Sequence, residues 1–297
     1  MADYVELLAL KGKLVQRASV ADFLADNDWD FDLILSPEAA SLSTMNQKTL
    51  SQRIDGADEL ASVVYRQLEE RQHVLRGRYP FILEDEHVKL DPAVDPKANA
   101  YVAVLAMTVA HAYGVPSGCA PARLFEQTVT DVLCERGIAA VGFAAVRRTH
   151  GSFEKALPIA CDAVGLIGNV EGVPVLKWAH DEKVDVLGHV GWEDGLRFGS
   201  WGFLGQVTVG RSDSWETKIK EPNRDHWKQF TGTGVSPARF LAVPHHVERQ
   251  MLERLTGDDT GIVLDRLRLV RYKAGVSENE ERVVEAVLGE YVEPLSG

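Results

Sequence analysis

The segment KVDVLGHVGWEDGLRFGSWGFLGQVTVG, residues 183–210, decides the expected fold. Two apolar runs, VDVLGHV and GFLGQVTVG, flank a polar, glycine-containing stretch, which is the pattern of two β-strands joined by a loop. Each run carries one polar group that an apolar strand seldom holds, Asp185 in the first and Gln206 in the second. The sequence therefore predicts a strand pair that presents an acid and an amide.

Alternation along the two strands predicts where these polar groups point. The apolar side chains that we expect to face one core are Val184, Val186, Phe203 and Val207. Asp185 and Gln206 would then face the same way. A carboxylate and an amide oxygen that converge on one point are hard ligands suited to Mg²⁺ or Mn²⁺. The alternative is an acid at a strand end that accepts backbone hydrogen bonds, beside an ordinary strand amide.

The flanking sequence predicts an α/β domain over residues 116–297. APARLFEQTVTDVLCERG, before the strand pair, is a helix that has Pro121 near its start and Gly137 after its end. Glu126 lies at the border of its apolar face, a common position for a surface glutamate. After the pair, RFLAVP and GIVLDRLRLVR predict two strands separated by the helix HVERQMLERLTG.

Residues 1–115 predict an N-terminal helical domain. DELASVVYRQLEERQHVL has the spacing of an amphipathic helix, and the segment 98–114 is a buried helix too short to cross a membrane. YPFILEDEHVKLDPAVDPKAN interrupts the helical pattern between them. The start, MADYVELLALKGKLV, lacks the features of a signal peptide, so we expect a cytoplasmic protein without membrane contact.

Composition limits the possible functions. A net charge of −12 argues against unaided binding of duplex nucleic acid, which usually needs a basic surface, although a metal or a basic partner could supply the charge. The three cysteines form no CxxC pair, which excludes a disulfide framework and a zinc knuckle. No GxxxxGK[ST] motif occurs, so any use of ATP would depend on a partner.

The order of these residues resembles a known superfamily. A helix with a glutamate, a strand with an acid, and a second strand with an acid or amide two residues before a lysine form the pattern of PD-(D/E)xK restriction-endonuclease-like nucleases. The matching residues are Glu126 in LFEQTV, Asp185 in KVDVLGHV and Gln206 in GQVTVG. The chain also resembles bacterial proteins of this superfamily that are associated with phage-defence loci. The shared segments are RGRYPFIL, FE, VDV, LGQVTVGRSDSWETK and LDRLRL.

The resemblance covers most of the chain and implies a mixed sheet flanked by helices that cleaves DNA with Mg²⁺ or Mn²⁺. Asp185 and Gln206 would hold the metal, with Glu126 as a further ligand or as a base that positions water. The implied protein is a nuclease, or a nuclease subunit of an anti-phage defence system. Its implied partners are DNA and other defence proteins, an ATPase among them.

The chain departs from the pattern at the lysine position, which holds Thr208. Threonine carries no positive charge to place beside the phosphate during cleavage. Lys183, on the strand face of Asp185, and Lys218, in SWETK, are the candidates to replace it. The resemblance favours Lys218, because similar sequences keep a tryptophan and a lysine at this spacing.

Two other classes of function remain open. The first is a catalytically silent nuclease fold that serves as a binding or assembly subunit, which Thr208 and the net charge of −12 favour. A lysine that reaches Asp185 and Gln206 would argue against it. The second is an unrelated α/β interaction protein, in which Asp185 and Gln206 would face apart.

Overall fold

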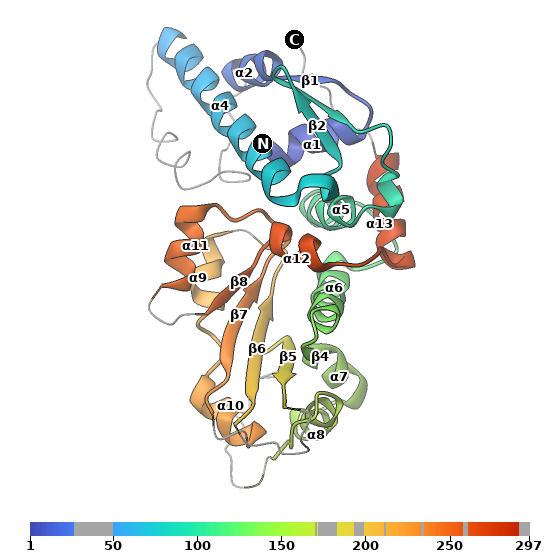
Figure 1. Cartoon of the computed structure of the whole chain (residues 1–297), viewed down its shortest axis with the longest axis vertical. Helices are drawn as coiled ribbons and strands as arrows, with labels where there is room; N and C mark the ends of the chain where they lie inside the picture. The colour runs from blue at the N-terminus through green and yellow to red at the C-terminus, as the bar shows by residue number, and fades with distance from the viewer. Residues whose placement is uncertain are drawn as a thin grey trace. The chain divides into compact units, whose positions relative to one another are not determined.

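The computed structural model describes residues 1–26, 50–169, 171, 183–192, 199–210, 212–232, 235–257 and 261–290. The chain forms two compact units, and Figure 1 labels their helices and strands. Unit 1 comprises Met1–Gly118, His246–Met251 and Gly275–Gly297. Unit 2 comprises Cys119–His245 and Leu252–Ala274, and it contains the strand pair of Asp185 and Gln206.

Unit 2 contains a mixed sheet of five strands in the order β4-β5-β6-β7-β8. Strands β4, β5 and β6 pair antiparallel, whereas β6, β7 and β8 pair parallel. The α/β class and the mixed sheet predicted from the sequence are confirmed. The strand bounds are Ala139–Gly142 for β4, Val186–Val190 for β5, Trp201–Val207 for β6, Ala238–Ala242 for β7 and Ile262–Leu264 for β8.

Helices of unit 2 begin and end largely where local signals predict. α6 starts at Pro121, at the first helical position, and Gly137 follows its end with a φ of 82°. The helices are α6 (Pro121–Glu135), α7 (Phe143–His150), α8 (Phe153–Ala163), α9 (Trp215–Lys218), α10 (Arg224–Thr231), α11 (Arg249–Thr256, which crosses into unit 1) and α12 (Arg266–Tyr272), with the 3₁₀ helix η4 (Ser212–Ser214).

The apolar residues of GIVLDRLRLVR predicted one strand, and this prediction is wrong. Only β8 is extended, and the chain turns into α12 directly after it. The Asp265 side chain accepts a hydrogen bond from the Arg268 backbone N–H, which caps the new helix. Asp265, a residue type that often caps the start of a helix, was the local signal for this change.

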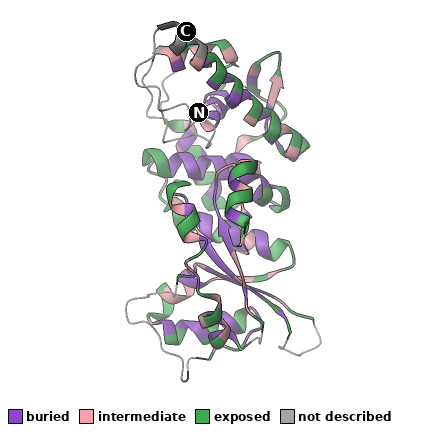
Figure 2. Ribbon diagram, turned by 90° about the vertical axis from the view of Figure 1, so that its left-hand side faces the viewer, coloured by how far each residue is buried: buried purple, intermediate pink, exposed green. Residues whose placement is uncertain are grey.

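The strands β5 and β6 pair as expected, and Val184 and Val186 are buried as predicted, but the core also includes Leu187 and Leu204. Leu187 lies opposite Leu204, and both belong to the core cluster of α7, α8 and α10. Phe203 and Val207 are only half-buried. Val184 belongs to the same cluster as Leu187, so strict alternation breaks at Asp185, whereas Gln206, two residues after Leu204, shares the face of Leu204. The strands in Figure 2 are coloured mostly as buried.

Gly205 tests this strand register, because it lies opposite Val186 on one side and Phe240 on the other. A Cβ atom at Gly205 would stand 2.0 Å from Phe240 Cζ, so the ring would have to move. Gly205→Ala is expected to lower the free energy of unfolding by roughly 1–3 kcal/mol, measured by urea denaturation. A Gly205→Ala/Phe240→Leu variant should recover part of the loss. Gly275→Ala, where nothing lies within 4 Å, is the control, and equal stability of the two alanine variants would contradict the register.

The sequence predicted a helical domain for residues 1–115, but unit 1 also contains a small sheet. The strands β1 (Val15–Gln16), β2 (Phe81–Glu84) and β3 (His87–Leu90) form an antiparallel sheet in the order β1-β3-β2. Asp85 and Glu86 connect β2 and β3 in a two-residue turn with φ values of 48° and 63°. Such turns usually contain asparagine or glycine, so the acidic LEDEH sequence concealed the hairpin.

The helices of unit 1 include the buried helix expected at 98–114, which is α5. Residues 101–110 are all buried, and Asn99 caps the first turn. In the described part of the chain, no helix is long and apolar enough to cross a membrane. The helices are α1 (Ala2–Leu10), α2 (Arg17–Asp26), α4 (Leu50–Leu75), α5 (Ala100–Tyr113) and α13 (Glu278–Gly289), with the 3₁₀ helices η2 (Arg76–Arg78) and η3 (Pro96–Ala98).

Helix α13 belongs to unit 1 and not to the domain 116–297 that the sequence suggested. It lies against α5, whose surface is apolar on every side and needs such a cover. A Ser277–Glu280 capping box starts α13, and Lys97 forms an ion pair with Glu285. The other expected boundary, between residues 115 and 116, is close to the end of the first segment of unit 1 at Gly118.

Candidate functional site

Asp185 lies at the bend where β5 begins, and its carboxylate has a structural partner. Its Oδ2 accepts a hydrogen bond of 2.8 Å from the Val207 backbone N–H. The Asp185 backbone N–H donates to the Gly205 carbonyl at 2.8 Å. The Asp185 carboxylate therefore satisfies the Val207 N–H of β6, which lies past the point where β5 and β6 are paired. The Asp185 side chain is half-buried.

Gln206 follows Gly205 on β6, where the regular pairing with β5 ends, because the Asp185 N–H donates to the carbonyl of Gly205, which is already the partner of Val186. Gln206 is buried, and its Nε2 donates a hydrogen bond to the Lys183 carbonyl. Lys183 has a φ of 60°, so the amide stabilises a strained turn that leads into β5. The Gln206 amide oxygen is the group that could act as a ligand.

Glu126 reaches the same end of β5 from α6. Its Oε1 is 3.0 Å from the position that a Cβ atom would take at Gly142, and Gly142 pairs with Val186. Any side chain at Gly142 would press on this carboxylate, so the glycine allows its close approach. The Oε1 atom is buried, and it accepts no hydrogen bond from any residue that the structure describes. Gly142, Val186 and Gly205 are paired across three strands and share one face of the sheet, so Glu126 lies on that face, whereas Gln206, the residue after Gly205, points to the other.

Burial raises the pKa of the Glu126 carboxyl above its ordinary value. The charge of Arg148 lowers this pKa, whereas the charge of Asp185 raises it. A hydrogen bond from the Ala145 backbone also lowers the pKa of Glu126. A buried acid held near a second acid is a disfavoured arrangement unless a cation or a proton compensates it.

Glu126→Gln is therefore expected to raise the thermal unfolding midpoint at pH 7. The folded-state pKa is raised, so the charged carboxylate costs stability above that pKa, and the cost disappears as the pH falls below the unfolded value. Glutamine keeps the shape without the charge. Differential scanning calorimetry should show the gain at pH 7 and its absence near pH 4. Asp131→Asn is the control, because Asp131 is a half-buried acid of the same helix and asparagine keeps the oxygen that accepts from Gln127 Nε2. A lower midpoint for Glu126→Gln at pH 7 would mean that its pair with Arg148 dominates.

Lys218 is not brought to this cluster. It is the last residue of α9, a helix that Trp215 anchors through a hydrogen bond from Nε1 to the Gly210 carbonyl. Among the described residues, Lys218 forms no hydrogen bond or ion pair with Glu126, Asp185 or Gln206. Thr208 lies just beyond β6, and its side-chain oxygen accepts from the Gly210 N–H at 3.1 Å. The place of the expected lysine is therefore held by Thr208, and Lys183, whose carbonyl accepts from Gln206, is the candidate that adjoins the strand pair.

Sequence reasoning missed Gly142 and Arg148. Arg148, in the last turn of α7, places its Nη1 3.6 Å from Glu126 Oε2. The run AAVGFAAVRRTH did not predict this contact, because the pairing of β4 with β5 decides where α7 begins. The Ala144 N–H donates to the Asp185 carbonyl at 3.2 Å, which ties the start of α7 to the cluster.

The residues of the cluster fit a divalent cation in part. Two carboxylates are hard ligands of the kind that Mg²⁺ and Mn²⁺ prefer, and the buried Glu126 Oε1 accepts no hydrogen bond from a described residue. Only two acids take part, and within the described ranges no three His, Cys, Asp or Glu side chains gather as a metal site. Water or a substrate oxygen would have to complete the coordination.

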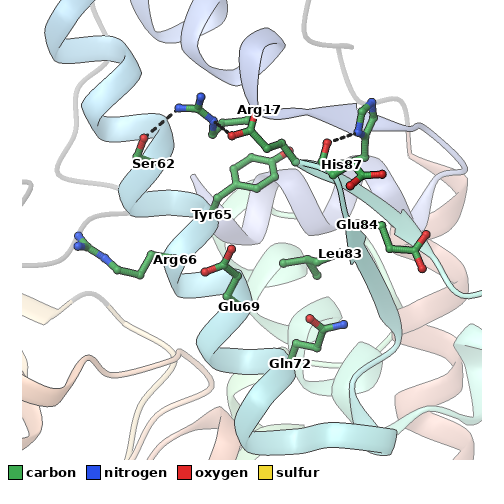
Figure 3. Close-up of a pocket in the computed structure, with 11 residues that line it drawn as sticks. Arg17, Ser62, Tyr65, Arg66, Glu69, Gln72, Leu83, Glu84 and His87 are labelled. Atoms are coloured by element: carbon green, nitrogen blue, oxygen red, sulfur yellow. Dashed lines mark hydrogen bonds and ion pairs between the residues drawn. The ribbon is translucent and has the colours of Figure 1, made fainter.

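A separate pocket of about 550 Å³ lies in unit 1, between α4 and the β2–β3 hairpin. Figure 3 shows Arg17 pointing toward Ser62 and the hairpin. Arg17 donates to Ser62 Oγ at 3.0 Å and to Glu86 Oε1 at 2.9 Å. The principal cation of this pocket is thus already paired. The lining residues are Arg17, Ser62, Tyr65, Arg66, Glu69, Gln72, Leu83, Glu84, Asp85, Glu86 and His87.

Comparisons of the chain with models of known protein families, with curated proteins and with solved structures found no match. The function of the cluster must therefore be argued from its own residues.

Proposed function

We propose that unit 2 is a restriction-endonuclease-like domain that hydrolyses DNA phosphodiester bonds with Mg²⁺ or Mn²⁺. The protein would act as a nuclease, or as the nuclease subunit of a bacterial anti-phage system. Its partners would be DNA and other defence proteins, including an ATPase. The resemblance of the LFEQTV, KVDVLGHV and GQVTVG segments to that superfamily motivates the proposal.

One observation carries the proposal. Glu126 is buried close to Asp185, and its Oε1 has no hydrogen-bond partner among the described residues. A carboxylate that serves only structure would normally have its acceptors satisfied, because an unsatisfied buried polar atom costs about 1–3 kcal/mol. A divalent cation would satisfy this oxygen and relieve the repulsion between the two acids.

Each residue has a definable part in the reaction. Glu126 and Asp185 would hold the cation through carboxylate oxygens, and Gln206 would support the turn before β5 through its hydrogen bond to the Lys183 carbonyl. The bound cation would lower the pKa of a coordinated water and offset charge on the phosphate. Glu126, whose pKa burial raises, is a stronger base than an exposed glutamate and could orient the attacking water and take its proton. Asp185 is held in place by the Val207 N–H, so its orientation is set before substrate arrives.

The deciding experiment is a titration of the full-length chain with MgCl₂ and MnCl₂ by calorimetry, paired with cleavage of plasmid and single-stranded DNA. We expect cation binding and metal-dependent cutting. A folded chain that binds neither ion and cuts neither DNA, alone or with the products of neighbouring genes, would refute the proposal.

A second function is supported by a specific observation, the loss of the lysine. With Thr208 at its position and no hydrogen bond or ion pair from Lys218 to the three site residues, the domain could be a silent nuclease fold that assembles a defence complex. The hydrogen bonds from Val207 to Asp185 and from Gln206 to Lys183 would then explain why both side chains are present. Metal binding distinguishes the two functions, because a scaffold needs none.

A further inference from the structure

Arg148 lies beside the candidate site without being locked into it. Its Nη1 is 3.6 Å from Glu126 Oε2, longer than the roughly 2.7–2.9 Å of a charge-assisted hydrogen bond. The Arg148 side chain is 38% exposed, whereas that of Glu126 is 11% exposed. The guanidinium therefore stands between the buried acid and solvent, where an incoming ligand could meet it.

The fold of α7 explains this position. The helix begins next to Asp185, because the Ala144 N–H donates to the Asp185 carbonyl. Arg148 follows Ala144 by four residues, which places it about 6 Å along the axis on the same helix face. The face of α7 that meets the start of β5 thus carries a positive charge one turn away.

The chemistry of the site requires such a charge. A phosphodiester is an anion, and the acids Glu126 and Asp185 would repel it. A guanidinium is always charged, and its fork of N–H donors matches two phosphate oxygens. Basic residues are also common in the last turn of a helix, where they stabilise its C-terminus. That explanation accounts equally for Arg147 and His150 but not for the contact of Arg148 with Glu126.

We propose that Arg148 binds a phosphate group of the nucleic-acid substrate and exchanges its contact with Glu126 for it. This inference rests on the proposed nuclease function and assigns the positive charge of that site. When Arg148 turns to the phosphate, the Glu126 carboxylate becomes available to the cation. In the protein without substrate, Arg148 is paired with Glu126.

The test is binding of a fluorescein-labelled single-stranded oligonucleotide to the full-length chain in CaCl₂, followed by fluorescence anisotropy. Arg148→Ala should weaken binding about tenfold or more, because a hydrogen-bonded charge pair is lost. The slope of log affinity against log salt should become shallower by about 0.7, the effect of one single-strand phosphate. Arg148→Lys should recover part of the affinity. Lys155→Ala, which removes an exposed charge from α8, should bind like the wild type.

Two outcomes would overturn the inference. One is an Arg148→Ala variant that binds the oligonucleotide as tightly as the wild type, and the other is a wild type that binds none. A purely structural Arg148 predicts unchanged oligonucleotide affinity and weaker Mg²⁺ binding through a misplaced Glu126. A phosphate-binding Arg148 predicts the reverse, with Mg²⁺ affinity kept or increased. Binding that depends on Arg148 without any metal binding or cutting would refute the nuclease proposal and leave the phosphate site standing.

Discussion

Asp185→Asn is expected to lower metal-dependent cleavage by roughly 10³-fold while the chain stays folded. A bound cation supplies several kcal/mol of transition-state stabilisation, and each 1.4 kcal/mol is a factor of ten in rate. Asparagine has the shape of aspartate and retains an oxygen that can accept the Val207 N–H hydrogen bond. The substitution thus removes the charge and keeps the structural contact. The measurement is the initial rate of plasmid cleavage in MgCl₂, with the Mg²⁺ affinity from calorimetry.

The choice of variant matters because Asp185 has two possible roles. Asp185→Ala would leave the Val207 N–H without its partner, at a cost of roughly 1–3 kcal/mol, and its inactivity could reflect a disturbed β5–β6 pair. Asp162→Asn removes an exposed acid of α8 and should cut normally. An Asp185→Asn protein that binds Mg²⁺ and cuts like the wild type would show that this acid serves only the strand pair.

A second large effect is expected at a buried charge network in unit 1. Glu6, on α1, is completely buried and accepts hydrogen bonds from Arg71 at 2.7 Å and from Tyr79 at 2.6 Å. Tyr101, on α5, donates to the same carboxylate at 2.7 Å. Burial opposes the charge of Arg71, but the charge of Glu6 raises the pKa of Arg71 further above its ordinary value. The network joins α1, α4 and α5 around one carboxylate.

Arg71→Ala is expected to lower the free energy of unfolding by roughly 3–5 kcal/mol, because it leaves the Glu6 charge buried without its partner. Urea denaturation followed by circular dichroism measures the loss. Lys89→Ala breaks an exposed ion pair with Glu84 and should cost less than about 1 kcal/mol. A Glu6→Gln/Arg71→Met variant should be more stable than Arg71→Ala. An Arg71→Ala protein no less stable than Lys89→Ala would contradict the burial of this pair.

These two effects differ in how far the sequence anticipated them. Asp185 was recognised as unusual because an acid interrupts an apolar run, a signal that a few neighbouring residues contain. Glu6 and Arg71 carried no such signal. Each belongs to a helix with ordinary charges, and their pairing spans 65 positions of the chain. A buried ion pair between distant helices depends on packing that no local pattern describes.

The sequence by itself determined the elements whose causes are local. Pro121 and Gly137 set the ends of α6, the apolar run at 98–114 predicted the buried α5, and the two apolar runs around Asp185 and Gln206 predicted β5 and β6. In each case the residues that decide the structure lie within one or two turns or one strand of each other, so propensity and alternation suffice.

Only the tertiary structure decided what lies around the site. The pairing of β4 with β5 places Gly142 next to the Glu126 carboxylate. The start of α7 next to Asp185 brings Arg148 to the Glu126 carboxylate as well. The tertiary structure also leaves Lys218 on α9 without a hydrogen bond or ion pair to Glu126, Asp185 or Gln206, and assigns α13 to unit 1. Such contacts join residues that are distant in sequence. The free energy that selects them comes from burying whole faces of helices and strands, which a short stretch of sequence does not specify.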